Sequence, residues 1–230
     1  MGYCFFELFS FQINGDIFFE TNSKADIFSM TGRNITVTGE KEIYLKTFAA
    51  ENKAYIESKS GPGIFGLDKE DGSAHINAAE IVLLAAGSIG NGSSCLLTKL
   101  KENGSIKASA EYDIYISNLS ETGITVEEIV SGSGGIAFAT HAAAYVKYMD
   151  AAGDIILTVY SGNLSIGRIA ASQSSEINVL EGSLINAGPG GANIEAEDIV
   201  LNIAGTVGTE DKYIYTDMAE DGSIAIIASG

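Results

Sequence analysis

Two histidines are the first candidates for chemistry, because histidine is the side chain that ordinarily gains and loses a proton near neutral pH. They are His75 and His141, which lie far apart in the chain. A serine hydrolase of the elbow type would carry a Gly-x-Ser-x-Gly motif, which this sequence lacks. His75 aligns with Asn193 in an internal repeat, so we expect an outward-facing position that tolerates either residue. Neither histidine predicts a catalytic site.

Carbohydrate chemistry would need a different set of residues. Glycosidases hold two carboxylates at a set separation across a cleft, and lyases that act on sugar acids need clustered acidic metal ligands and a basic partner. Arg33 and Arg168 are the only arginines, and no acidic cluster falls on a predicted strand. A carbohydrate-active or carbohydrate-binding protein is nevertheless the alternative hypothesis. Several tyrosines could line a sugar groove or be half-buried strand residues: Tyr112, Tyr115, Tyr145, Tyr148, Tyr160, Tyr213 and Tyr215.

Metal binding has little support from the sequence. Turns 68–72 and 220–222 are acidic and could bind calcium weakly through carboxylates, but solvated turns have the same composition. The Gly-Gly-x-Gly-x-Asp calcium repeat is absent, and Cys4 and Cys95 do not have a zinc-binding spacing. We therefore predict no catalytic, cofactor-binding or metal-binding residue, no cofactor and no enzymatic activity.

The net charge limits the choice of partner. The 230 residues include 13 basic and 30 acidic side chains, which gives a formal net charge of −17. Such a chain repels nucleic-acid phosphates and anionic membranes, so we expect no nucleic acid partner and no membrane insertion. No stretch reaches the ~18 apolar residues of a transmembrane helix, and the amino terminus lacks the basic region of a signal peptide. We expect a segment of a longer protein whose export signal lies upstream.

The elements that would position any site are short strands. Apolar and polar residues alternate over a few positions throughout the chain, as at 35–37, 114–116 and 155–159. This alternation is typical of a strand with one buried face, and the frequent Ile, Val and Thr favour strands. Glycine-containing turns such as Asn103-Gly104 and Asp221-Gly222 separate them. The pattern predicts an all-β fold.

One stretch of the sequence occurs twice. Residues 72–110 and 190–228 align without a gap at a constant offset of 118. Both copies have the same apolar alternation and the same glycines, whereas the polar residues between them differ. This indicates a scaffold, in which each repeating unit buries its apolar face against its neighbours.

The spacing of the strands favours stacked coils. Corresponding strand starts are predicted at Ile114, Ile136, Ile155, Ile177 and Ile199, with sequence steps of 22, 19, 22 and 22. This period predicts a parallel β-helix of ~20–24 residues per coil, in which the offset of 118 corresponds to five or six coils. An antiparallel β-sandwich is the alternative, because turn signals also recur at the short spacing of hairpins. We assign residues 1–25 to a Phe-rich cap or irregular first coil and residues 26–230 to the β-helix.

Strands that end in a glycine corner, as in 81–90 and 199–208, give the chain a family resemblance. Together with 109–116 and 151–157, they resemble the repeat regions of filamentous haemagglutinin-like and leukotoxin-type bacterial exoproteins. The resemblance covers residues 26–230. It implies a right-handed β-helix that is secreted and displayed on the bacterial cell surface. The function that it implies is a non-catalytic structural or adhesive shaft, whose partners are host-cell or surface glycans or proteins and neighbouring coils of a longer parent chain.

Overall fold

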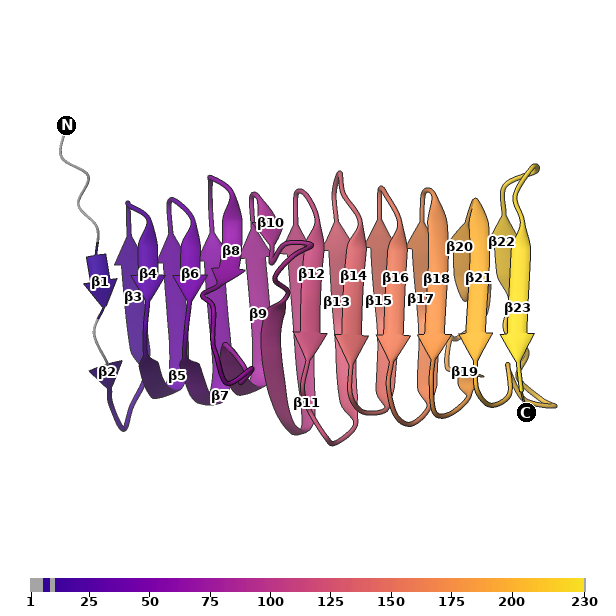
Figure 1. Cartoon of the computed structure of the whole chain (residues 1–230), viewed down its shortest axis with the longest axis horizontal. Coiled ribbons are helices and arrows are strands. Elements are labelled where there is room, and N and C mark those ends of the chain that lie inside the picture. Colours follow the sequence, from indigo (N-terminus) through magenta and orange to yellow (C-terminus); the bar gives the residue numbers. More distant parts are fainter. Residues whose placement is uncertain (1–5, 9–10, 230) are drawn as a thin grey trace.

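The protein is a parallel β-helix of about ten coils (Figure 1). A computed structural model describes residues 6–8 and 11–229. Within these residues the chain forms 23 strands and no helix, so no helix long and apolar enough to cross a membrane is present there. All pairings between these strands are parallel, and each joins one coil to the next. The predicted β-helix is therefore confirmed, and the antiparallel sandwich is wrong.

One stack of strands runs along the whole molecule. Each of its strands pairs in parallel with the one before and the one after it. The stack consists, in order, of β1 (Phe6–Leu8), β4 (Ala25–Ile27), β6 (Ile43–Leu45), β8 (Gly63–Gly66), β10 (Ser88–Ile89), β12 (Ile114–Asn118), β14 (Ile136–Thr140), β16 (Ile155–Val159), β18 (Ser174–Val179), β21 (Asp198–Ile203) and β23 (Ile224–Ala228).

The remaining strands close each coil on its other sides. Several of them are long and change register at a bend, so one strand covers two faces. They are β2 (Phe11–Gln12), β3 (Ile17–Thr21), β5 (Met30–Gly39), β7 (Phe48–Ser58), β9 (Ile76–Ala85), β11 (Leu96–Ala110), β13 (Ile124–Ser131), β15 (Ala144–Ala151), β17 (Leu164–Ala171), β19 (Leu184–Asn186), β20 (Ile194–Ala196) and β22 (Thr216–Met218).

Alternate side chains of every coil point inward and form columns along the axis. Ile114, Ile136 and Ile155 occupy successive positions in one column and are at most 2% exposed. Because stacked strands lie ~4.8 Å apart, each inward residue touches its counterparts directly above and below. The apolar alternation of the sequence thus becomes one continuous core, which the coils share.

Coil length varies more than the sequence spacing predicts. One inward column consists of Ile17, Ile35, Ala54, Ile81, Ile106, Val126, Val146 and Ile166. The sequence steps along this column are 18, 19, 27, 25, 20, 20 and 20. Most coils therefore have close to the predicted length. The coil from Ala54 to Ile81 is the longest, because a loop at 67–75 separates β8 from β9.

One predicted position in the stack is wrong by two places in the sequence. Ile155 pairs with Ser175, and Ser175 pairs with Ile199. Ile177 instead lies in the neighbouring column, between Leu157 and Leu201. The two coils therefore differ in length, whereas the prediction gave them equal lengths. A shift by two leaves the same side chains facing inward, so the apolar pattern does not reveal it.

The two sequence repeats lie at different places around the coil. Ile81 belongs to the column that reaches Val126 and Ile166. Its repeat partner Ile199 belongs to the column of Ile89 and Ile114 instead. From Ile89 to Ile199 is five coils, and Ile81 precedes Ile89 by less than half a coil. An offset of 118 is therefore not a whole number of coils.

The amino-terminal segment predicted as a cap or irregular first coil, residues 1–25, is described only in part. Phe5 and Phe9 lie outside the described residues. In the described part, β1 pairs in parallel with β4, β2 with β5, and β3 with β5. These strands therefore extend the parallel stacking of the following coils, and Phe18 is an exposed side chain of β3.

Replacing Ser175 by Ala should stabilise the protein. Ser175 is fully buried between Ile155 and Ile199, and its hydroxyl has no hydrogen-bond partner among the described residues. Removal of a buried polar atom without a partner should raise the free energy of unfolding by about 1 kcal/mol, measured by thermal or urea denaturation. Ser165→Ala, on the outward side of β17, is the control and should change little. A loss of stability in Ser175→Ala would contradict the assignment of an unpaired hydroxyl.

Candidate functional site

The tyrosines singled out in the sequence do not gather in one groove. Tyr115 lines a small cavity of about 250 Å³ with Asp113 and Asp154. Tyr148 lies on another face, where its hydroxyl donates to Asp150 Oδ2 at 2.6 Å. Tyr145 is half-buried on β15, whereas four others are exposed at 43–62%: Tyr112, Tyr160, Tyr213 and Tyr215. The structure therefore does not assemble a tyrosine-lined sugar site from these residues.

The two arginines form ion pairs between coils. Arg33 Nε donates to Asp16 Oδ1 at 2.9 Å. Arg168 makes a two-bond contact with Glu195, at 2.9 Å from Nε and 2.6 Å from Nη2. This contact holds the pKa of the Glu195 carboxyl below its usual value. Both arginines therefore have a structural partner in a neighbouring coil.

Several acidic side chains form hydrogen bonds between neighbouring coils at the corners. Their carboxylate oxygens accept a hydrogen bond from a backbone N–H of the next coil: Asp113 from Gly135 at 2.8 Å, Asp154 from Ser174 at 2.9 Å and Asp198 from Ser223 at 2.8 Å. The contacts with Ser223 lower the pKa of Asp198. Some of the acidic side chains of the protein therefore stabilise the stacking of its coils.

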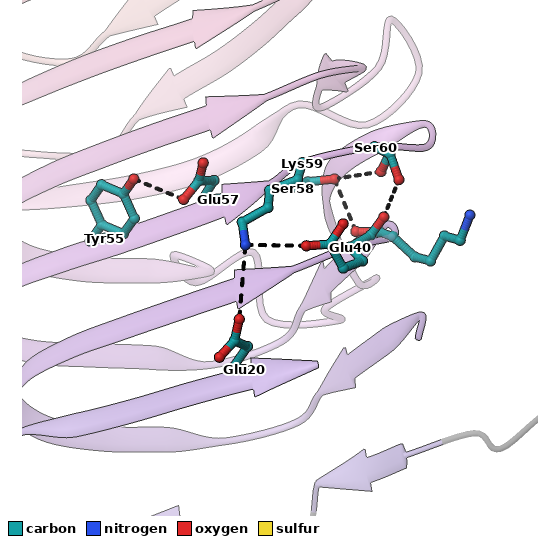
Figure 2. A network of polar contacts seen from close by, with 8 residues as sticks. Glu20, Glu40, Tyr55, Glu57, Ser58, Lys59 and Ser60 are labelled. Carbon is teal, nitrogen blue, oxygen red and sulfur yellow. Dashed lines mark hydrogen bonds and ion pairs between the residues drawn. The ribbon is translucent and has the colours of Figure 1, made fainter. Parts of the chain in front are cut away.

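Ion pairs also run along the outer surface (Figure 2). The Lys59 ammonium lies 3.1 Å from Glu40 Oε1 and 3.8 Å from Glu20 Oε1, and so joins three successive coils. The hydrogen bond with Glu40 raises the pKa of Lys59. Exposed pairs of this kind contribute little to stability. They pair opposite charges on successive coils and do not form a concave site.

His75 is buried, so the prediction of an outward-facing position is wrong. Its side chain is 3% exposed. The Leu97 N–H donates to His75 Nδ1 at 2.9 Å, so Nδ1 must be the unprotonated nitrogen, and His75 Nε2 then donates to the Leu67 carbonyl at 2.9 Å. The ring closes the loop at 67–75 and fixes it to the next coil. The sequence could not reveal this, because a polar residue in a turn usually faces solvent.

Asn193, the repeat partner of His75, plays the same part at another place in the fold. It is 2% exposed. Its Oδ1 accepts from the Tyr215 N–H at 3.1 Å, and its Nδ2 donates to the Gly167 carbonyl at 3.0 Å. In both copies the acceptor bond reaches the residue 22 positions further on. The repeat therefore encodes a loop that ends in a buried polar residue bonded to the next coil.

His141, in contrast, is exposed, and its ring centroid lies 4.8 Å from that of Tyr160. Among the described residues, no group of three or more His, Cys, Asp or Glu side chains could hold a metal ion. The acidic turn at 68–72 lies on the wall of a cavity instead of around a cation site. The acidic side chains of the turn at 220–222 are exposed.

A groove of about 860 Å³ lies beside the loop at 67–75. Thr47, Ala49 and Asn77 form part of its floor, and the loop at 67–75 forms a wall. Three lysines and three carboxylates line it: Lys46, Lys69, Lys99, Asp68, Glu70 and Asp71. A second cavity of about 260 Å³ shares Ala49 and Asn77 with it and includes Lys101. These cavities together are here called the lysine groove, and sequence reasoning missed it because its residues come from separate coils.

Comparison with known proteins gives no relative. No protein-family model, no curated protein and no solved structure matches the chain. The resemblance to bacterial exoprotein repeats therefore stays a prediction.

Lowering the pH should weaken the protein through His75. Burial holds the pKa of His75 below the usual 6.5. The unfolded chain therefore binds the proton more readily, and the free energy of unfolding should fall as the pH drops from 7.5 through 6.5. Denaturation curves across this range measure the effect. His75→Asn should be less stable at pH 7.5 and should lose most of the slope, whereas His141→Asn should retain it. An equal slope in His75→Asn would refute this prediction.

Proposed function

We propose that the chain is a non-catalytic structural segment of a secreted or surface-displayed bacterial exoprotein, a β-helix shaft that also offers an adhesive surface. The observation that carries the proposal is the uninterrupted stacking of parallel coils around one shared apolar core. Among the described residues, the last strand of this stack is β23, which pairs in parallel with β21. The other side of such a strand can pair with a further parallel strand.

The inward side chains of β23 support the same proposal. Ile224 and Ile226 continue the columns of Ile199 and Leu201. The latter pair is fully buried, whereas Ile224 is 41% and Ile226 is 52% exposed. Exposed apolar surface that continues a core is stabilised by another coil of the same kind. The first coil of a second copy would provide such a surface.

The surface chemistry agrees with a shaft. Corner carboxylates and outer ion pairs bind coil to coil, as at Asp198 and Lys59. The high content of solvated acidic side chains gives such a rod solubility and discourages lateral contact between copies. Adhesion would then use side chains on the faces of the rod, while further coils stack on its ends.

The isolated chain should associate end to end. Ile226→Asp places a charge on the inward face of the coil of β23 and should weaken this association at least tenfold, as measured by analytical ultracentrifugation over a range of concentrations. Ala225→Asp adds the same charge on the outward side of the same strand, in the column of Val200, and is the matched control. Circular dichroism should show unchanged strand content in both variants. Equal behaviour of both variants, or a monomer at all concentrations, would count against extension through this coil.

A further inference from the structure

We propose that the loop at 67–75 is an acid-sensitive element, which detaches from the stack when His75 gains a proton while the coils around it stay folded. This local opening is a different event from the unfolding of the whole chain, because only one anchor is lost. It also does not depend on the shaft function, since the loop takes no part in the pairing of β23 with β21. The two proposals can therefore fail separately.

Both ring nitrogens of His75 are committed in the closed loop. Nδ1 accepts from the Leu97 N–H of the next coil at 2.9 Å, and Nε2 donates to the Leu67 carbonyl at 2.9 Å. A protonated imidazole has two N–H donors and no acceptor. Its Nδ1–H would face the N–H of Leu97, so the bond that fixes the loop to β11 would become a contact between two donors. The closed loop therefore excludes the charged ring.

The packing around the ring gives it no alternative arrangement inside the fold. The His75 side chain is 3% exposed and lies directly over Gly66. A Cβ atom added to Gly66 would overlap the ring, at 2.6 Å from both of its nitrogens. Turning the ring over does not restore an acceptor, because both nitrogens of the cation are donors. A buried charge without suitable partners is costly, so the charged ring should move out to solvent.

The charged side chains nearby do not compensate for protonation of the ring. Among the described residues, Asp68 and Lys69 act on His75 in opposite directions, since the carboxylate favours the cation and the ammonium disfavours it. The other charged side chains of the groove are Lys46, Lys99, Glu70 and Asp71. β8 and β11 bring uncharged groups against the ring, namely Gly66 and the Leu97 N–H. Burial is therefore the largest influence, and it holds the pKa of His75 below 6.5.

The hydrogen bonds of the loop interior stay within the loop. The Lys69 ammonium donates to the Ala74 carbonyl at 2.7 Å, and the Ser73 N–H donates to Asp71 Oδ1 at 2.9 Å. These bonds hold the loop in shape but do not fasten it to a neighbouring coil. The ring of His75 joins the loop to β11 through Leu97, so its departure removes this side-chain anchor.

The two ends of the loop remain attached when the ring leaves. The Leu67 N–H donates to the Leu45 carbonyl at 2.8 Å, and the backbone N–H of His75 donates to the Leu97 carbonyl at 2.8 Å. These backbone bonds belong to the stacking of the coils and involve no titratable group. Opening therefore changes one wall of the lysine groove while the neighbouring coils keep their pairing.

The second copy of the repeat offers an internal comparison. Asn193 accepts from the Tyr215 N–H at 3.1 Å and donates to the Gly167 carbonyl at 3.0 Å, so it makes the same two kinds of bond as His75. An amide side chain does not gain a proton near neutral pH. The loop that ends at Asn193 should therefore stay closed in acid. One rod thus contains an acid-sensitive loop and an insensitive one of the same origin.

The test is amide hydrogen exchange of the intact chain, followed by NMR at pH 7.5 and 5.5 and expressed as protection factors, which remove the intrinsic effect of pH. The protection of the Leu97 N–H should fall about fivefold to tenfold, because the open loop binds a proton with the usual histidine pKa of 6.5. Two amides with non-titrating partners should change less than about twofold: Leu100, which donates to Ser120 Oγ at 2.7 Å, and Tyr215. Unchanged protection of Leu97, or an equal fall at all three amides, would overturn the proposal.

Two variants separate the ring from the rest of the loop, and the protection of Leu100 reports that each stays folded. His75→Asn has no titratable group, so its Leu97 protection should be equal at both pH values. Gly66→Ala places a Cβ atom where the ring lies, so it should lower the Leu97 protection at least fivefold already at pH 7.5. Gly123→Ala is the matched control, because a Cβ atom there comes no closer than 3.7 Å to a neighbouring atom. A persistent pH dependence in His75→Asn, or parent-like protection in Gly66→Ala, would contradict the assignment of His75 as the acid-sensitive anchor.

Discussion

The fold depends on one constraint: the backbone groups of each strand find their hydrogen-bond partners in the coils before and after it. Parallel strands cannot pair with their neighbours in sequence through a short turn, so every strand is joined to one that lies a full coil away. Even in the shortest of these coils Ile17 pairs with Ile35, well beyond the reach of a hairpin. All other features serve this stacking. Inward columns share one apolar core, and corner carboxylates and outer ion pairs join the same coils at the surface.

The constraint also explains why the loops need anchors. A loop inserted into a coil interrupts the hydrogen bonding between strands and leaves backbone groups to be paired in another way. His75 and Asn193 provide such pairing, each by accepting an N–H from the next coil and by donating to a carbonyl of the protein backbone. Buried polar residues of this kind are costly unless all their groups are bonded. The lysine groove exists because the first of these loops is held in a fixed position.

Much of the fold was predictable from the sequence, and much of the candidate site was not. Period-2 alternation and a regular recurrence of strand starts indicate stacked parallel strands because they follow from the geometry of the coil itself. The register of a single strand did not follow, since Ser175 and Ile177 both face inward and only the loop lengths decide between them. The burial of His75 depends on contacts with Leu67 and Leu97, which no local pattern reveals. The lysines of the groove come from three separate coils, so their convergence becomes visible only when the coils are stacked.

The mismatch between the repeat and the coil has a consequence for how this kind of rod diversifies. The two copies begin at different angular positions, yet each gives a working loop with its own buried anchor. A repeated segment of this type can therefore form its loop on any side of the coil. Duplication followed by insertion can decorate any face of the rod while the axis stays straight, because the inward alternation is restored as soon as the loop closes. Evolution can in this way change what the rod displays without altering what holds it together.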